Sequence, residues 1–164
     1  MRISKRRRTE GRTDYNKRMK LLTGRAPRVL FRKTNRYIVA QYVTSSEAQD
    51  KVEIGITSSQ LEEFGWPKEF GGSLKSIPAS YLTGLLLGKE ISNKKLETPI
   101  VDLGMVKAIA KNKVFAFIKG LVDAGIEIKC DKENFPEEEK LQGKNLKKDF
   151  SGIFKTIKSK IEKE

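Results

Sequence analysis

The chain has 164 residues, with 34 Lys and Arg against 21 Asp and Glu, which gives a formal net charge of +13. It contains one cysteine and no histidine, which excludes an internal disulfide and a structural zinc site built from four Cys or His ligands. Without histidine there is no Ser-His-Asp or Cys-His triad and no imidazole general base, so most enzyme classes are excluded.

Length and hydropathy predict one domain with a tail and no membrane partner. A chain near 150 residues is typical of a single domain with its own hydrophobic core. No apolar run approaches the roughly 20 residues that span a bilayer. The first residues lack the apolar stretch of a signal peptide, so we expect an intracellular protein.

The positive charge is concentrated at the N-terminus. Residues 1–36 contain fourteen Lys or Arg and two acids, a net charge of +12, whereas the other 128 residues carry only +1. A polyanion is the natural partner of such a segment, because each phosphate contact releases condensed counterions. A solubilising or targeting tail is the plainer alternative. A membrane-surface helix is disfavoured, since the segment lacks an apolar face rich in Trp, Phe and Leu.

The first 26 residues are predicted to form a basic RNA-binding arm with a short helix. Residues 1–12 show no apolar periodicity and are expected to stay disordered until they meet a partner. Thr13 is a plausible N-cap, and Tyr15, Met19 and Leu22 then form one apolar stripe. Gly24 follows the end of this helix.

Residues 27–130 are predicted to form an α/β core that begins with three strands. Residues 29–33 and 37–44 are rich in β-formers, and residues 34–36 form the turn between them. Residues 45–50 make the second connection, and residues 51–56 alternate between apolar and polar side chains as a third, half-buried strand does. An antiparallel three-stranded meander is the simplest arrangement.

Helical periodicity follows the third strand. Residues 59–64 form a short helix, Ser76 caps a longer one that ends beyond Leu86, and residues 113–124 form a second core helix. Between the last two, residues 99–103 form a short apolar strand that we expect to be central and parallel. Residues 126–128 form either another strand or an extended exit from the core.

Residues 131–164 are predicted to be an acidic segment followed by a C-terminal amphipathic helix. One apolar stripe of this helix consists of Phe150, Ile153, Phe154, Ile157 and Ile161. The stripe fits equally well against the body of the same chain and against a partner protein.

The glycine-rich stretch from Gly84 to Lys89 superficially resembles a phosphate-binding loop. It has one intervening residue too few, and Glu90 stands where Ser or Thr should follow. Its two glycines instead predict close packing of one helix against another.

No catalytic, metal or cofactor site is predicted. Asp102 could serve a two-metal nuclease only if Glu53 and Asp123 happened to converge on it. Cys130 has no histidine to activate it and is expected to be inert.

The predicted hairpin of residues 28–42 is the most informative segment for function. Basic and polar side chains cluster there beside aromatic ones, a combination that suits RNA, because Arg contacts phosphate bidentately and exposed rings stack on unpaired bases. We assign Phe31 and Tyr42 to the core. The residues assigned to RNA are Arg32, Lys33, Asn35 and Arg36.

Over about residues 12–146, the chain resembles the family of large-subunit ribosomal protein eighteen, and the matching segments follow one another in the same order. The segments that carry the resemblance are residues 13–15, 18, 20–22, 27–36, 40–41, 65–66, 78–84, 102–104, 114–116, 119–120 and 123–125. The acidic run at 135–139 and Gly143 resemble the archaeal and eukaryotic branch rather than the bacterial one.

The resemblance implies a non-enzymatic protein of the cytoplasmic large ribosomal subunit. It implies binding of 5S ribosomal RNA (rRNA), docking of that RNA to the large-subunit rRNA in the central protuberance, and contact with the neighbouring ribosomal protein five. It also implies a core of ribonuclease-H-like topology and no small-molecule substrate. The implied RNA-binding residues are Arg6, Arg7, Arg8, Arg12, Tyr15, Lys17, Arg18, Lys20, Arg28, Arg32, Lys33, Asn35 and Arg36.

Two other hypotheses remain open at the level of the sequence. A ribonuclease-H-like nuclease would need a carboxylate cluster and metal-dependent cleavage. A generic basic protein that compacts nucleic acid would bind duplex DNA as readily as RNA, and competition between the two nucleic acids distinguishes it from a specific RNA-binding protein.

Overall fold

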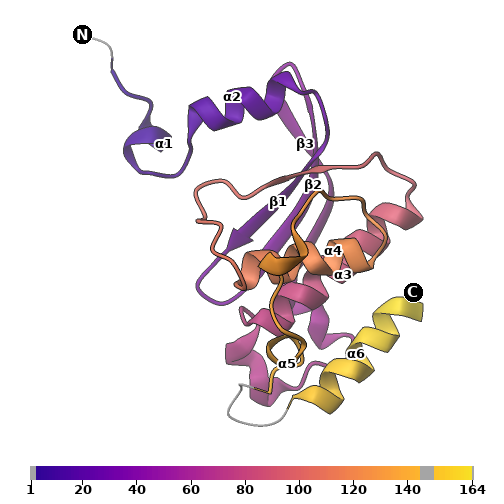
Figure 1. Cartoon of the computed structure of the whole chain (residues 1–164). Helices are drawn as coiled ribbons and strands as arrows, with labels where there is room; N and C mark the ends of the chain where they lie inside the picture. The colour runs from indigo at the N-terminus through magenta and orange to yellow at the C-terminus, as the bar shows by residue number, and fades with distance from the viewer. Residues whose placement is uncertain (1–2, 145–149, 164) are drawn as a thin grey trace.

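The protein is described by a computed structural model covering residues 3–144 and 150–163. Its centre is a sheet of four strands, and Figure 1 shows the sheet between the N-terminal arm and the long helices. The strands are β1 (Arg28–Lys33), β2 (Ile38–Ser46), β3 (Gln49–Thr57) and β4 (Ile100–Asp102). They lie in the order β3-β2-β1-β4, with antiparallel pairing within the first three and parallel pairing of β4 with β1. The predicted meander and parallel strand of the ribonuclease-H-like α/β fold are therefore confirmed.

The second turn of the meander is much shorter than the sequence predicts. Strand β2 continues to Ser46 and β3 begins at Gln49, so only Glu47 and Ala48 connect them. Both residues have positive φ values, 49° and 65°, as a tight two-residue hairpin requires. The expected six-residue connection is wrong because neither residue is the Gly or Asn that normally marks such a turn.

Strand β4 is at the edge of the sheet and not at its centre. Among the described strands it pairs with β1 alone, and Ile100 leaves 42 % of its surface exposed. Residues 126–128 are an extended exit, and in the ranges that the structure describes they add no fifth strand beside β4. The apolar run at 99–103 is therefore an edge strand, with a hydrogen-bonded neighbour along one edge and none described along the other.

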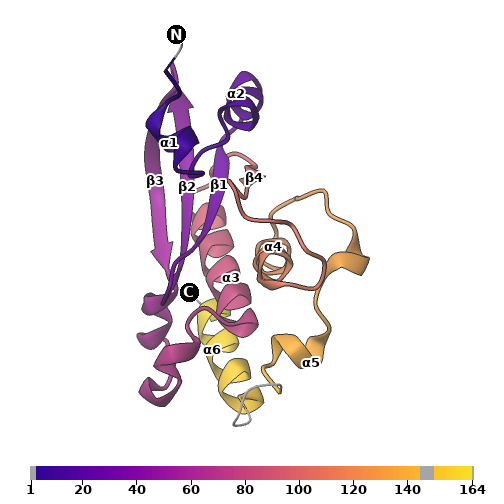
Figure 2. The same ribbon diagram turned by 90° about the vertical axis from the view of Figure 1, so that its left-hand side faces the viewer.

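Two long helices cover one face of the sheet (Figure 2). Helix α3 (Ile77–Asn93) begins at its predicted cap, Ser76, whose hydroxyl accepts a hydrogen bond from the Ala79 N–H. Helix α4 (Lys113–Asp123) lies beside it. The alternating side chains of β1 and β2, among them Phe31 and Tyr42, pack into the same core as the buried faces of both helices, as predicted for these two rings.

Four short helical elements lie in the connections around these helices. They are the 3-10 helices η1 (Ser58–Glu62), η2 (Lys68–Ser73) and η3 (Lys132–Asn134) and the single-turn helix α5 (Glu138–Leu141). Element η1 takes the place of the predicted helix at 59–64, and the chain leaves it through Gly65 at φ +102°. None of the helices described is long and apolar enough to cross a lipid bilayer.

Helices α3 and α4 approach each other closely at their glycines. A Cβ atom on Gly120 would lie 2.2 Å from the Tyr81 carbonyl oxygen, and one on Gly84 would lie 2.3 Å from the Phe117 carbonyl oxygen. The two backbones touch where side chains normally separate helices. A Cβ atom on Gly88, the second glycine of the predicted pair, would lie 2.5 Å from the Ala124 Cβ. The predicted role of Gly84 and Gly88 in close helix packing is therefore confirmed.

Replacing Gly120 by alanine is expected to lower the free energy of unfolding by about 1–3 kcal/mol, because the new methyl group forces the two backbones apart. Gly152→Ala is the matched control, since a Cβ there meets no atom within 4 Å and alanine favours the helix. Urea unfolding of both variants tests this expectation. Equal midpoints for Gly120→Ala and wild type would contradict it.

The C-terminal helix α6 (Ser151–Lys163) packs onto the body of the chain. The rings of Trp66 and Phe150 lie 4.5 Å apart between centroids, and those of Tyr81 and Phe154 lie 5.5 Å apart. Ile157 and Ile161 are also buried. Of the two open alternatives for its apolar stripe, the structure selects packing within the chain.

The N-terminal arm contains two helices, α1 (Arg6–Thr9) and α2 (Tyr15–Thr23). The expectation of no regular structure in residues 1–12 is wrong for α1, which salt bridges from Arg6 and Arg12 to Glu10 support. Helix α2 is capped by Asp14 in place of Thr13, because the Asp14 carboxylate accepts hydrogen bonds from the backbone of residues 16 and 17.

The predicted division of the chain at residues 26 and 130 stays a prediction. Residues 1–2, 145–149 and 164, which belong to its outer segments, lie outside the described ranges.

Candidate nucleic-acid interface

A basic groove of about 810 Å³ runs between the N-terminal arm and the sheet. Strand β1 forms its floor, residues 7–18 of the arm form one wall, and residues 103–106 after β4 form the other. Its cationic side chains come from both the arm and β1: Arg7, Arg12, Lys17, Arg18, Arg32 and Lys33. The structure thus brings together residues that the sequence separates by up to 26 positions.

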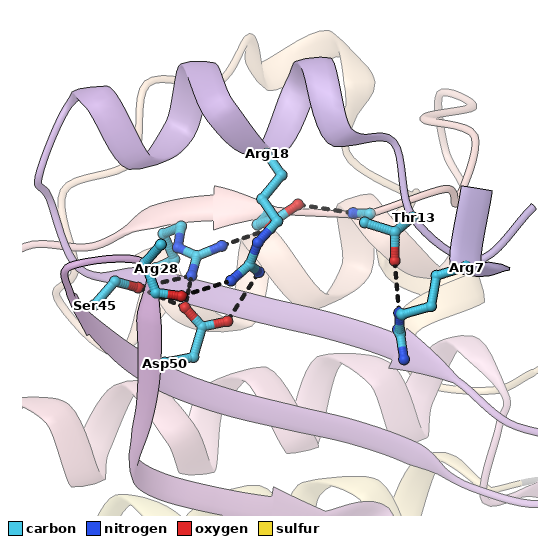
Figure 3. Close-up of polar contacts among 9 residues, drawn as sticks. Arg7, Thr13, Arg18, Arg28, Ser45 and Asp50 are labelled. Atoms are coloured by element: carbon cyan, nitrogen blue, oxygen red, sulfur yellow. Dashed lines mark hydrogen bonds and ion pairs between the residues drawn. The ribbon is translucent and has the colours of Figure 1, made fainter. Parts of the chain in front are cut away.

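Helix α2 is fastened to the sheet by polar contacts rather than by apolar packing. The Arg18 guanidinium donates to the Asp50 carboxylate at 2.9 Å, and the Lys17 ammonium donates to the Gly104 carbonyl at 3.3 Å. None of the α2 side chains is fully buried. At the far end of the arm, the Arg7 Nε–H donates to the Thr13 hydroxyl at 2.9 Å (Figure 3). The arm is therefore ordered over the sheet by its own charges.

Arg28 ties the strands together beneath this arm. Its guanidinium donates to Asp50 at 2.7 Å, to Ser45 at 2.8 Å and to Asp102 at 3.3 Å, and the side chain is only 1 % exposed (Figure 3). Asp102 also accepts from the Gly104 N–H at 2.9 Å. One network thus links β1, β2, β3, β4 and the groove wall. The prediction that Arg28 binds RNA is not supported, because this guanidinium is buried and directs three of its five N–H donors to partners within the protein.

Asp50 joins this network to the arm and stays ionised. Burial alone would raise the pKa of Asp50, but hydrogen bonds from Arg18 and Ser45 and the charges of Arg28 and Arg18 outweigh it and lower the pKa. A lowered carboxyl pKa stabilises the fold fully above its unfolded-state value, and this contribution is lost as pH falls through the folded-state value. The link between the arm and the sheet is therefore intact at neutral pH.

The acids in the groove do not cancel its positive charge. Asp14 caps α2, whereas Asp50 and Asp102 form salt bridges with arginine side chains of the protein itself. Arg32 and Lys33 on the floor are exposed and form no salt bridge with any carboxylate in the described ranges. Their charges face solvent, as a phosphate-binding surface requires.

The remaining predicted RNA-binding residues flank the groove or stay close to it. Tyr15 lines it, and the Lys5 ammonium lies 4.4 Å from the Tyr15 ring centroid. Asn35 and Arg36 are exposed in the β1–β2 turn beyond the end of the floor. Arg6, Arg8 and Lys20 are exposed on α1 and α2 but do not line the groove.

The groove wall at residues 103–106 was not predicted from the sequence. Met105 and Val106 expose 55 % and 37 % of their surfaces, beside the basic side chains. The available signal was Asp102 two residues before Gly104 (φ +57°), a spacing typical of a turn in which the carboxylate accepts from the backbone.

The carboxylates considered for a metal site are far from sharing one. Asp102 pairs with Arg28, Glu53 with Lys51, and Asp123 accepts from the Tyr81 hydroxyl at 2.7 Å. Within the described ranges no three His, Cys, Asp or Glu side chains are placed to hold a metal ion together. The geometry gives no support to the nuclease hypothesis.

Comparison with known proteins identifies a family that this chain resembles over most of its length. The model of the family described as "Ribosomal large subunit proteins 60S L5, and 50S L18" matches residues 1–99. The large ribosomal subunit protein uL18 of Korarchaeum cryptofilum is 39 % identical over 141 residues, 86 % of this chain and 70 % of the relative. That of Methanoregula boonei is 39 % identical over 144 residues, which cover 88 % and 80 % of the two chains. That of Methanoculleus marisnigri is 40 % identical over 141 residues, 86 % and 78 %.

Proposed function

Since the chain belongs to the family of ribosomal large subunit proteins that comprises 60S L5 and 50S L18, we propose that it binds 5S rRNA and attaches it to the large-subunit rRNA in the central protuberance. Its relatives are structural ribosomal proteins and not enzymes. The chain is accordingly a cytoplasmic constituent of the large subunit, with rRNA and ribosomal proteins as its partners. Ribosomal protein five is proposed as its protein neighbour on the strength of the family resemblance.

The observation that carries the proposal is the groove with cationic side chains on both its floor and its arm wall. Arg32 and Lys33 come from a rigid strand, whereas Arg7 and Arg12 come from the arm. A backbone of RNA lying in the groove would meet positive charge on two sides. Such contacts recognise the shape and phosphate spacing of an RNA rather than a long base sequence.

The network around Arg28 contributes by preorganising this surface. It positions Asp50, which holds Arg18, and Asp102, which holds the wall through the Gly104 N–H. The arm is therefore placed over β1 before RNA arrives, so less ordering entropy opposes binding. Release of counterions from the RNA supplies the driving force.

Neutralising the floor and the hairpin tip is expected to weaken 5S rRNA binding without unfolding the body. In Arg32→Gln/Lys33→Gln/Arg36→Gln, three exposed charges are lost, so the dependence of log K on log salt should become less steep by about 2–3. The matched control is Lys129→Gln/Lys155→Gln/Lys163→Gln, which removes three exposed charges elsewhere. Filter binding over a salt series, with circular dichroism of each variant, measures both effects. If the Arg32→Gln/Lys33→Gln/Arg36→Gln variant is folded and binds 5S rRNA as tightly as wild type, the hairpin is not part of the interface.

A further inference from the structure

Two further lysines, outside the set predicted from the sequence, lie near Lys33 at the end of β1. The rings of Phe31 and Phe117 lie 5.1 Å apart between centroids, which places α4 directly beneath β1. Lys33 follows Phe31 by two residues on the same face of the strand, and Lys113 precedes Phe117 by one helical turn. The ring contact therefore brings Lys33 and Lys113 to the same end of the core.

Lys75 joins this pair from the segment before α3. Its ammonium donates to the Asn35 carbonyl at 2.7 Å, which holds it against the β1–β2 turn, two residues from Lys33. The three lysines come from three different parts of the fold, and we refer to Lys33, Lys75 and Lys113 as the lysine cluster. No carboxylate in the described ranges forms a salt bridge with any of them.

The electrostatics of the lysine cluster are unfavourable without an anion. Burial lowers the pKa of Lys113, and the nearby charges of Lys33 and Lys75 lower it further. Lys113 is also the first residue of α4, where the helix dipole disfavours a cation and favours an anion. Three like charges are thus held together at a positive helix end, an arrangement that an anionic ligand would stabilise.

We propose that the lysine cluster is a phosphate-binding site that extends the RNA interface beyond the end of β1 onto α4. Lys33 belongs to both surfaces, so an RNA backbone leaving the groove past Lys33 meets Lys75 and Lys113 next. Lysine presents a compact charge on a flexible stem, which suits backbone phosphates of any sequence. This inference rests on the proposed function, since it assigns further contacts to the same RNA.

The test compares Lys75→Gln/Lys113→Gln with wild type in binding to 5S rRNA over a salt series. Two lost phosphate contacts should make the slope of log K against log salt less steep by about 1.4–1.8. The matched control, Lys129→Gln/Lys155→Gln, removes the same charge from exposed positions elsewhere and should keep the wild-type slope. Because the substitution relieves repulsion, the Tm of the free protein should stay the same or rise.

Two results would overturn the lysine cluster as a phosphate site. One is a slope for Lys75→Gln/Lys113→Gln equal to that of the control pair. The other is a slope for Lys75→Arg/Lys113→Arg as shallow as for the glutamine variant, since arginine retains the charge. Failure of the proposed function gives a different result from failure of the lysine cluster. The wild-type chain itself would then show no preference for 5S rRNA over other nucleic acids.

Discussion

Replacing Arg28 by methionine is expected to lower the free energy of unfolding by about 3 kcal/mol, the low end of the range for breaking a buried ion pair. The substitution leaves the side chain of Asp102, 11 % exposed, without its cation. Asp50 retains Arg18 and is 29 % exposed, which is why the low end applies. Chemical unfolding monitored by circular dichroism measures the loss.

Two companion variants separate the charge network from the size of the side chain. Arg25→Met removes an exposed arginine just before β1 and should change the stability by less than about 0.5 kcal/mol. Arg28→Met/Asp50→Asn/Asp102→Asn removes the stranded carboxylates and should recover part of the loss. A wild-type midpoint for Arg28→Met would contradict the structural role assigned to this guanidinium.

Deleting residues 1–24 is expected to weaken 5S rRNA binding at low salt, and to remove about 10³-fold of the affinity that the full chain loses between 50 and 200 mM salt. The deletion removes seven of the predicted basic contacts, which are Arg6, Arg7, Arg8, Arg12, Lys17, Arg18 and Lys20. Seven phosphate contacts correspond to a salt slope that is shallower by about 5 to 6. No other single change proposed for this chain should affect binding as strongly.

The deletion should leave the body folded, because the described residues of α1 and α2 bury no side chain in the core. Far-ultraviolet circular dichroism and the urea midpoint check this. Met19→Ala is the control within the arm, since this side chain is 70 % exposed and uncharged, and it should retain wild-type affinity. A truncated protein that binds 5S rRNA as tightly as the full chain would exclude the arm from the interface.

Local patterns in the sequence correctly predicted the features that depend on one strand or one helix alone. The alternation in β1 correctly assigned Phe31 to the core and Arg32 to the surface, because side chains on a strand point to opposite faces in turn. The capping serine of α3 and the close helix contact at Gly84 were equally visible, since each depends on local geometry. The strong bias of charge toward the arm indicated the class of partner.

What the sequence could not predict depends on residues that meet only in the folded chain. Arg28 shares a strand face with Arg32, but Asp50 and Asp102, which enclose it, lie 22 and 74 positions away. Lys113 was assigned only to a core helix, and its proximity to Lys33 follows from how α4 lies under the sheet. The partner of α6 was open for the same reason, because Trp66 and Tyr81 are far from it in sequence.

The most direct test of the proposed function is whether other nucleic acids compete with 5S rRNA for the full chain. The affinity of the purified protein for 5S rRNA is measured with excess transfer RNA or duplex DNA present, for wild type and for the chain lacking residues 1–24. We expect wild-type binding to survive both competitors and the truncated chain to lose it. Equal displacement of wild type by any polyanion would contradict the proposal and leave a generic basic protein.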